Sequence, residues 1–242
     1  MAPVSRAPSP PSGTSLHRRI VHGLGRQILS GKIRPGQPLP VPTGVTASRT
    51  ALREAIKVLT AKGLVEARPR VGTRVRPRAD WHLFDKDVIA WQRGGRLGAA
   101  FLDELTEVRE ILEPATAALA ASRATKPDVD LIERAYADMV DATNGGRVRL
   151  DAFVDADTRF HVGILKASGN ELLTQMGQTV FTALVLSFRA TATRPGAARA
   201  SLPRHRAILD AIKRGRPAEA RRAMLSLMAH TARELHKIEA PQ

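Results

Sequence analysis

One stretch of the sequence constrains the fold more than any other, the residues from Ser48 to Val75, SRTALREAIKVLTAKGLVEARPRVGTRV. In its first half, apolar residues recur at helical spacing between an N-cap serine, Ser48, and a terminating glycine, Gly63. The second half reads as two short strands, 64–67 and 73–76, joined through a basic turn. A helix that offers arginines from its first turns, followed by a basic hairpin, predicts a winged helix-turn-helix.

The charges of the chain favour DNA as the partner of this module. Arg49 and Arg53 lie one turn apart, on the face opposite the apolar stripe. Residues 1–80 carry 15 Lys and Arg against 3 Asp and Glu, whereas residues 81–242 carry 23 against 20. Almost all of the net charge of +15 therefore lies in the first third, where it favours binding to duplex DNA through counterion release. The alternative is a solvated basic helix on an unrelated α/β domain.

The remaining sequence predicts a mostly α protein with two domains. Residues 1–15 have four prolines among the first eleven positions and no apolar core of a signal peptide, so we expect a disordered tail. We expect the winged module to span 16–78, and 79–97 to be a linker, in which residues 80–92 form either an extended connection or a short helix whose two tryptophans dock one domain on the other. The pattern from 98 to 238 is that of an all-α bundle without strands, with helices expected at 98–123, 126–144, 149–168, 171–193, 198–214 and 217–238.

Composition and motifs argue against several other classes of protein. The chain has no cysteine, so it forms no disulfide and suits a reducing cytosol. No apolar run reaches membrane-spanning length, and no basic amphipathic stretch carries bulky inserting residues, so we expect a cytoplasmic protein without a membrane partner. The sequence has no HExxH, GxSxG or phosphate-loop motif, and we therefore expect that the protein is not an enzyme. A metal-dependent hydrolase or lyase is the alternative.

Three histidines and one aspartate form the second informative set. Asp157 and His161 lie four residues apart in DADTRFHVGIL, so they project from the same face of one helix. His205 and His230 lie on two later helices. If these helices surround one cavity, three imidazoles and a carboxylate suit Zn²⁺, Ni²⁺ or Mn²⁺, with positions left open for a ligand. Taken singly, each histidine is more often a hydrogen-bonded core or surface residue.

Both ends of the chain resemble one family of regulators. The segment ILSGKIRPGQPLP and the stretch from Ser48 to Val75 resemble the GntR superfamily of bacterial transcription regulators. The segments LTEVREILEPATAALAA, DTRFHVGILKASGN, HRAILDAIKRG and ARRAMLSLMAH resemble its FadR-like branch, whose second domain is the ligand-binding FCD domain. The resemblance implies a homodimer with an all-helical effector domain. It implies a divalent metal, zinc before nickel or manganese, at Asp157, His161, His205 and His230, and DNA contacts at Arg49, Thr50, Arg53 and Gly72.

The resemblance also implies an effector. The segment WHLFDKDVIAWQ is similar to the galactonate-operon repressor group, which responds to sugar acids, so a small carboxylate is expected. Arg109 is the position expected to clamp its anionic group, and the alternative is an ion pair with Glu113. One departure is that residues 41–47, VPTGVTA, stand where the family has a whole helix of the helix-turn-helix. We therefore expect a ligand-gated regulator that binds operator DNA, or alternatively a metal- and ligand-binding dimer that has lost competent DNA binding.

Overall fold

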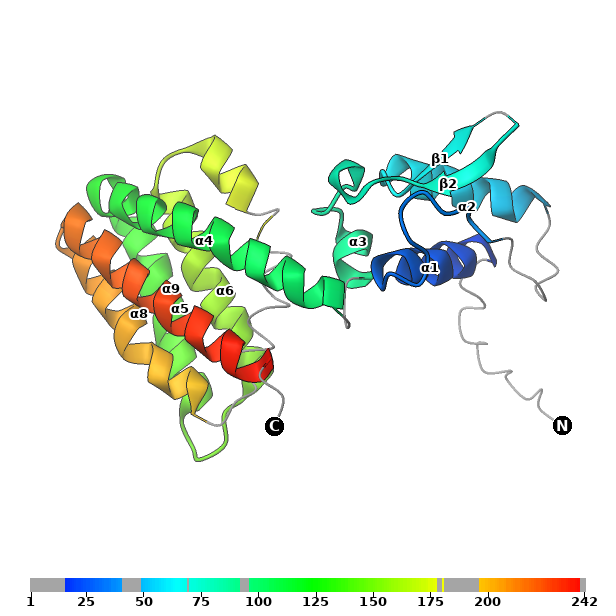
Figure 1. Ribbon diagram of the computed structural model, residues 1–242. Coiled ribbons are helices and arrows are strands. Elements are labelled where there is room, and N and C mark those ends of the chain that lie inside the picture. Colours follow the sequence, from blue (N-terminus) through cyan, green and yellow to red (C-terminus); the bar gives the residue numbers. More distant parts are fainter. Residues whose placement is uncertain are drawn as a thin grey trace, which may run out of the picture. The chain divides into compact units, whose positions relative to one another are not determined.

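The computed structural model describes residues 16–40, 49–68, 70–91, 96–177, 180 and 196–239 (Figure 1). The expected tail at 1–15, the N-cap Ser48 and the short segment 41–47 lie outside the described residues. So does most of the helix expected at 171–193, of which residues 171–177 and 180 are described. The chain divides after Gly98 into two compact units, which are described one at a time.

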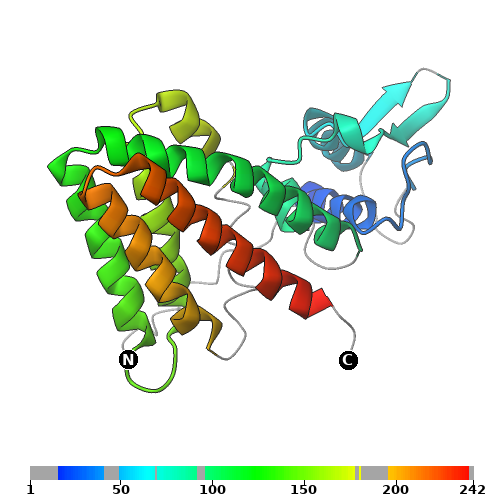
Figure 2. The ribbon, with the colours of Figure 1, turned by 60° about the vertical axis from the view of Figure 1, so that its left-hand side comes forward.

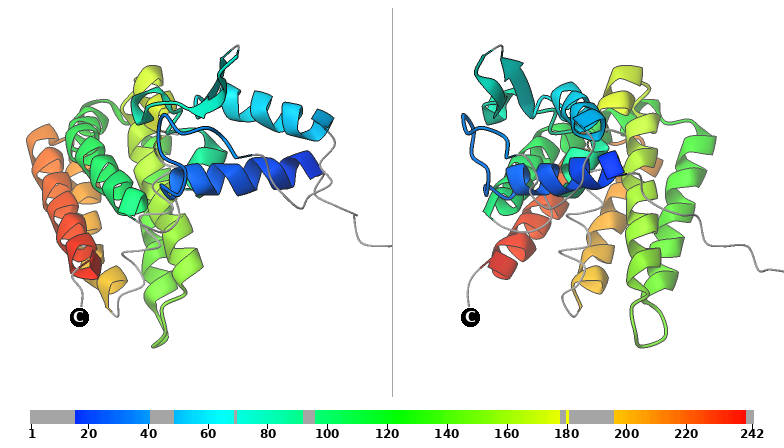
Figure 3. Two further views of the ribbon diagram at one scale, coloured as in Figure 1. Left: turned by 45° about the vertical axis from the view of Figure 1, so that its right-hand side comes forward. Right: turned by 90° about the vertical axis from the view of Figure 1, so that its right-hand side faces the viewer.

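The N-terminal unit contains the elements of a winged helix-turn-helix. Its helices are α1 (Leu16–Leu29) and α2 (Arg49–Ala61), and its wing is formed by β1 (Val65–Arg68) and β2 (Gly72–Val75) (Figure 3). α2 packs against α1, since Ala55 and Leu59 on one face of α2 are fully buried in the same apolar core as Leu24 and Ile28 of α1.

Gly63 ends α2 for two reasons. It has a positive φ of 73°, a conformation that glycine adopts at little cost. A Cβ at this position would also collide with the carbonyl oxygen of Asp80, so the close approach of the following chain requires glycine. The predicted glycine stop of this helix is therefore confirmed.

The wing is an antiparallel pair in which Val65 lies opposite Val75 and Arg68 opposite Gly72. Gly72 has a φ of 88°, which again favours glycine. The segment that follows α1 extends this small sheet, because the amide of Leu39 donates a hydrogen bond to the carbonyl of Thr73 at 2.9 Å. The predicted basic hairpin is present, with strands shifted by no more than one residue from the expected bounds.

The segment expected to be a linker belongs instead to the N-terminal core. It forms a 3₁₀ turn, η1 (Arg78–Asp80), and a short helix, α3 (Lys86–Trp91). Trp81, Val88 and Trp91 are buried in the same apolar cluster as α1 and α2. The reason is that α3 covers a face of α1 with apolar side chains. The interpretation of 79–97 as a linker is therefore wrong for residues 79–91, and both tryptophans pack within this unit.

The C-terminal unit is all-α in its described residues, as predicted. Its helices are α4 (Arg96–Arg123), α5 (Lys126–Thr143), α6 (Leu150–Ala167), a helical segment at 171–177, α8 (Ala197–Lys213) and α9 (Pro217–Glu239). Figure 2 shows α5 beside α6 and α8 beside α9, with α5 also packed against α8. None of the described helices combines the length and apolar character needed to cross a membrane.

The core of this unit combines small alanines with larger apolar side chains at helical spacing. Small alanines of α4 and α5 allow close helix packing around larger side chains such as Met139, Phe160 and Leu209, all fully buried. The helix ends follow the sequence signals: the amide of Thr125 donates to Asp128 Oδ2 at 2.9 Å before α5, and Gly215 with a φ of 63° follows α8. This packing fixes the inward faces of α6, α8 and α9.

Candidate metal and effector site

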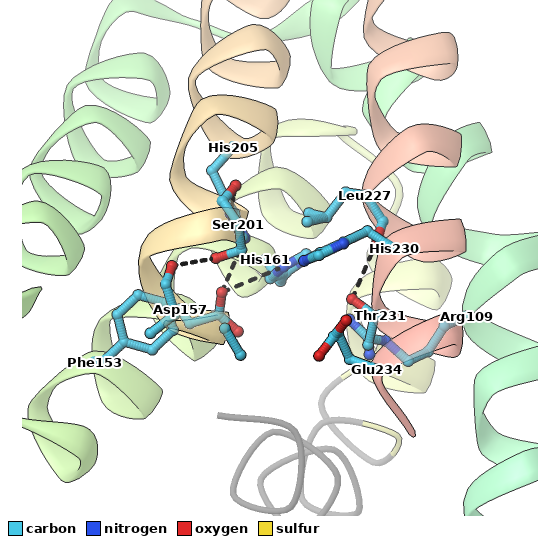
Figure 4. Close-up of a pocket in the computed structure, with 12 residues that line it drawn as sticks. Arg109, Phe153, Asp157, His161, Ser201, His205, Leu227, His230, Thr231 and Glu234 are labelled. Atoms are coloured by element: carbon cyan, nitrogen blue, oxygen red, sulfur yellow. Dashed lines mark hydrogen bonds and ion pairs between the residues drawn. The ribbon is translucent and has the colours of Figure 1, made fainter. Parts of the chain in front are cut away.

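Three of the four predicted metal ligands converge inside the C-terminal unit. α6 carries Asp157 and His161 one turn apart on its buried face, and α8 presents His205 opposite them (Figure 4). His205 Nε2 lies 2.9 Å from Asp157 Oδ1, and His161 Nε2 lies 3.9 Å from the same oxygen. One donor atom from each residue lies within 4.8 Å of the other two, and all three side chains are buried. This is a donor set that suits a divalent cation.

Both imidazoles are held so that Nε2 faces the shared aspartate. His205 Nδ1 lies 3.0 Å from the backbone carbonyl of Ser201, and His161 Nδ1 lies 2.7 Å from Glu113 Oε2. A carbonyl and a carboxylate oxygen only accept hydrogen bonds, so each Nδ1 faces an acceptor for the hydrogen that a metal-bound imidazole would carry there. The residues therefore fit a metal ion, because the two Nε2 atoms and Asp157 Oδ1 face one another and could all ligate it.

The fourth predicted ligand, His230, lines the same pocket from α9. Its side chain is half-buried, and among the described residues it stands outside the compact group of donor atoms formed by the other three. His230 as a ligand stays a prediction.

The ion pair that the sequence offered as one alternative for Arg109 is present, and the contact of Arg109 with an effector stays a prediction. Its Nε donates to Glu113 Oε1 at 2.6 Å, one helical turn on in α4, so the ion pair is present. The same buried guanidinium also lines the pocket that contains Asp157 and His161. Burial raises the pKa of a carboxyl group, but Arg109 and His161 together outweigh this effect and lower the pKa of Glu113 to about 2. Glu113 is therefore an ionised, buried carboxylate.

The pocket around these residues is small and partly open to solvent. Phe153, Ala197, Ala198 and Leu227 supply apolar wall, while Ser201, Thr231 and Glu234 add polar groups. Sequence reasoning found the metal-ligand candidates and Arg109, but it missed these polar wall residues and the contact of Glu113 with His161. No sequence signal ties them to the site, because they come from three different helices.

The predicted DNA contacts are placed on the surface of the N-terminal unit where they are described. Thr50 and Arg53 are exposed on the first turns of α2, and Arg49 begins that helix. Nothing lies within 4 Å of the position where a Cβ of Gly72 would stand, so this part of the wing backbone is open to a partner. Their contact with DNA stays a prediction.

Comparison with known proteins identifies the family. Residues 16–75 match the family model described as "Bacterial regulatory proteins, gntR family", and residues 104–230 match the FCD domain. The galactonate operon transcriptional repressor of Escherichia coli K12 is 35% identical over 229 residues, which cover 91% of this chain and 96% of that protein. The chain belongs to the GntR family. The Glc operon transcriptional activator of Escherichia coli K12 is a further relative of this GntR regulator, 28% identical over 91% of this chain and 89% of that protein.

A solved structure agrees with this assignment. Streptococcus agalactiae GntR has a TM-score of 0.52 and is 25% identical, with 90% of this chain and 99% of that chain covered. The relatives are transcriptional regulators, and this GntR chain is accordingly a bacterial transcription regulator with an FCD domain and not an enzyme. The relatives include both a repressor and an activator, so family membership alone leaves the direction of regulation open.

Proposed function

We propose that this GntR regulator binds operator DNA as a homodimer in the cytoplasm and is gated by a small carboxylate held at a divalent metal ion. The observation that carries the proposal is the convergence of Asp157, His161 and His205, each buried and each with a donor atom within 4.8 Å of the others. His230 would complete the set from α9. When bound, the metal would act as a Lewis acid that anchors carboxylate and hydroxyl oxygens of the ligand.

The charges around the pocket support an anionic ligand. A divalent cation and Arg109 would together balance the carboxylates of Asp157, Glu113 and Glu234, and the cation and the guanidinium would still offer the groups with which an anion pairs. Guanidinium groups pair with carboxylates through their planar array of donors. The polar wall of Ser201 and Thr231 offers hydroxyl groups, so a polyhydroxy carboxylate suits the pocket better than a lipid.

The relative that represses a galactonate operon points to the same class of ligand, since galactonate is a sugar acid. Zinc is the first candidate metal, with nickel and manganese as alternatives, because two imidazoles and a carboxylate suit all three. The structural basis for a small ligand is the lining of the pocket, where the candidate metal ligands and Arg109 stand beside hydroxyl groups and apolar walls.

The experiment combines metal analysis with calorimetry. Purified protein is expected to contain about one divalent ion per chain, and zinc-loaded protein to bind galactonate or gluconate but not neutral galactose. His161→Ala is expected to lower metal content and to abolish sugar-acid binding, whereas His82→Ala, an exposed histidine of the other unit, is expected to leave both unchanged. Protein without metal, whose melting temperature is unaffected by a chelator, would rule the proposal out.

The second candidate function is a ligand-binding dimer without competent DNA binding. The observation that favours it is the sequence VPTGVTA at 41–47, which contains a proline and a glycine where the family has a helix. Selection of bound sequences from a pool of duplexes, followed by a gel-shift titration of the best sequence, decides between the two. Sequence-specific binding supports the regulator that binds its operator, and equal affinity for random duplexes supports the second candidate.

A further inference from the structure

Glu113 occupies a special place in the C-terminal unit, because its two carboxylate oxygens hold different partners. Oε1 accepts a hydrogen bond from Arg109 Nε at 2.6 Å. Oε2 lies 2.7 Å from His161 Nδ1. The side chain of Glu113 is only 6% exposed, so both contacts are shielded from water and stronger than surface contacts would be. Arg109, Glu113 and His161 thus form a continuous buried chain from the pocket wall on α4 to a candidate ligand on α6.

We propose that Glu113 is a positioning residue of the metal site, which fixes the tautomer and the orientation of His161 and joins that histidine to Arg109. The inference rests on the proposed metal site. Glu113 is not one of the proposed metal ligands, and its role is to hold one of them. A carboxylate that accepts from the outer N–H of a ligating histidine fixes the ring and raises the basicity of the inner nitrogen.

The two histidines of the site are supported in different ways, which makes the inference specific. His205 rests on the backbone carbonyl of Ser201, four residues earlier in α8, and side-chain substitutions leave that acceptor in place. His161 depends on a side chain from another helix, α4. Loss of the Glu113 carboxylate therefore releases one of the two imidazoles and leaves the other supported.

The contact with Arg109 gives Glu113 a second effect. Because one carboxylate holds both the guanidinium and the imidazole, a shift of Arg109 toward a bound anion also acts on the partner of His161. The ligand and the metal are then coupled through a shared residue as well as through direct coordination. Such coupling is reciprocal, so the state of Arg109 also affects metal affinity.

The test measures zinc affinity of the full-length protein by competition with a chromogenic chelator. Glu113→Gln keeps the shape of the side chain, but its oxygen is a neutral and weaker acceptor and its amide group opposes Arg109. The expected result is a loss of zinc affinity of about 10- to 100-fold. Glu110→Gln is the matched control. Glu110 follows Arg109 in α4 and is exposed, so this variant is expected to bind zinc as the wild type does.

Two further measurements keep the inference falsifiable if Glu113→Gln folds poorly. The double variant Arg109→Met/Glu113→Gln removes both buried charges, so it leaves no unpaired guanidinium and is expected to fold yet to bind zinc as weakly as Glu113→Gln. In the zinc-loaded wild type, nitrogen-resolved NMR of the imidazoles is expected to find the N–H of His161 on Nδ1. That signal tests positioning directly and is independent of the stability of any variant.

The outcomes separate the inference from the proposed function. Wild-type protein that binds zinc, with Glu113→Gln and the double variant unchanged in zinc affinity, overturns the inference and leaves the metal site standing. An N–H on Nε2 of His161 in the loaded protein overturns it as well. Wild-type protein that binds no divalent metal overturns the metal site, and the inference falls with it.

Discussion

Two glycines of α1 show how a single residue depends on its surroundings. Gly23 and Gly25 lie in the same helix, but a Cβ on Gly25 would run into the indole ring of Trp91, whereas nothing lies within 4 Å of a Cβ on Gly23. Gly25 is buried beneath α3, and Gly23 faces open space. The glycine at 25 therefore permits the docking of α3 on α1, and the glycine at 23 only weakens the helix.

The contrast predicts opposite effects of the same substitution. Gly25→Ala is expected to lower the free energy of unfolding of the N-terminal unit by about 1–3 kcal/mol, because the methyl group overfills a packed contact. Gly23→Ala is expected to raise it by up to about 1 kcal/mol through higher helix propensity. Urea unfolding followed by tryptophan fluorescence measures both. Equal stability of the two variants would mean that Trp91 does not pack on Gly25.

At the same scale, the candidate metal ligands could be predicted and their support could not. A spacing of four residues places Asp157 and His161 on one helix face whatever the tertiary structure. His205 and His230 were candidates on two later helices, and the family resemblance joined them to the same site. The spacing of Arg109 and Glu113 predicts an ion pair equally well. It carries no information on His161, because that contact joins two helices that only the folded bundle brings together.

At the scale of elements, two acidic side chains, Asp85 and Asp87, hold α3 to Lys62, and Asp85 also caps the helix. Asp85 Oδ1 accepts from the amides of Asp87 at 2.9 Å and Val88 at 3.2 Å, so it caps the helix. The same carboxylate accepts a hydrogen bond from Lys62 Nζ at 2.7 Å, which ties α3 to the end of α2. Burial raises the pKa of Asp85, but Lys62 and the two amides outweigh it and hold that pKa below its ordinary value.

This arrangement predicts an acid-sensitive contribution to stability. A carboxyl group whose pKa is lowered in the folded state stabilises that state above its unfolded pKa, near 3.8, and the contribution is lost as the pH falls through the lower folded value. Asp85→Asn is therefore expected to lower the free energy of unfolding by about 1–2 kcal/mol at pH 7. The difference from wild type is expected to shrink below about pH 4. A constant difference between pH 7 and pH 3, measured by denaturant titration, would contradict this assignment.

Helix ends were predictable at this scale, and the packing of α3 was not. Glycines after α2 and α8 and the proline in the first turn of α9 mark those boundaries through local backbone chemistry. α3 is only six residues long, too short for a periodic pattern that would show which of its faces is buried. The sequence therefore left a linker and a short helix open, and it gave no sign that this segment covers α1 and builds part of a core.

At the scale of the whole molecule, the basic N-terminal unit predicts two classes of DNA-binding variant. Arg53 is exposed on the first turns of α2, and Arg70 lies at the tip of the wing with a positive φ of 63°. Arg53→Ala is expected to weaken binding to the specific operator by about 1–3 kcal/mol, as loss of a base contact does.

Arg70→Asn introduces a residue that tolerates this backbone conformation, and it removes one positive charge. It is expected to weaken binding to all duplexes and to reduce the salt slope by about 1. Fluorescence anisotropy on operator and random duplexes at several salt concentrations distinguishes them, and identical behaviour of both variants would refute the assignment of α2 as the reading helix.

The last prediction concerns the link between the two units of this GntR regulator. If a sugar acid releases the operator, thermodynamic linkage requires the operator-bound protein to bind that acid more weakly than free protein, by the same factor. Calorimetric titration of galactonate into zinc-loaded protein, with and without saturating operator, is expected to give dissociation constants that differ about 5- to 150-fold. The direction also distinguishes modes of regulation, because an acid that strengthens operator binding must bind more tightly to the complex. Equal constants in the two titrations would separate ligand binding from DNA binding altogether, and the protein would then be the ligand-binding dimer of the second candidate function.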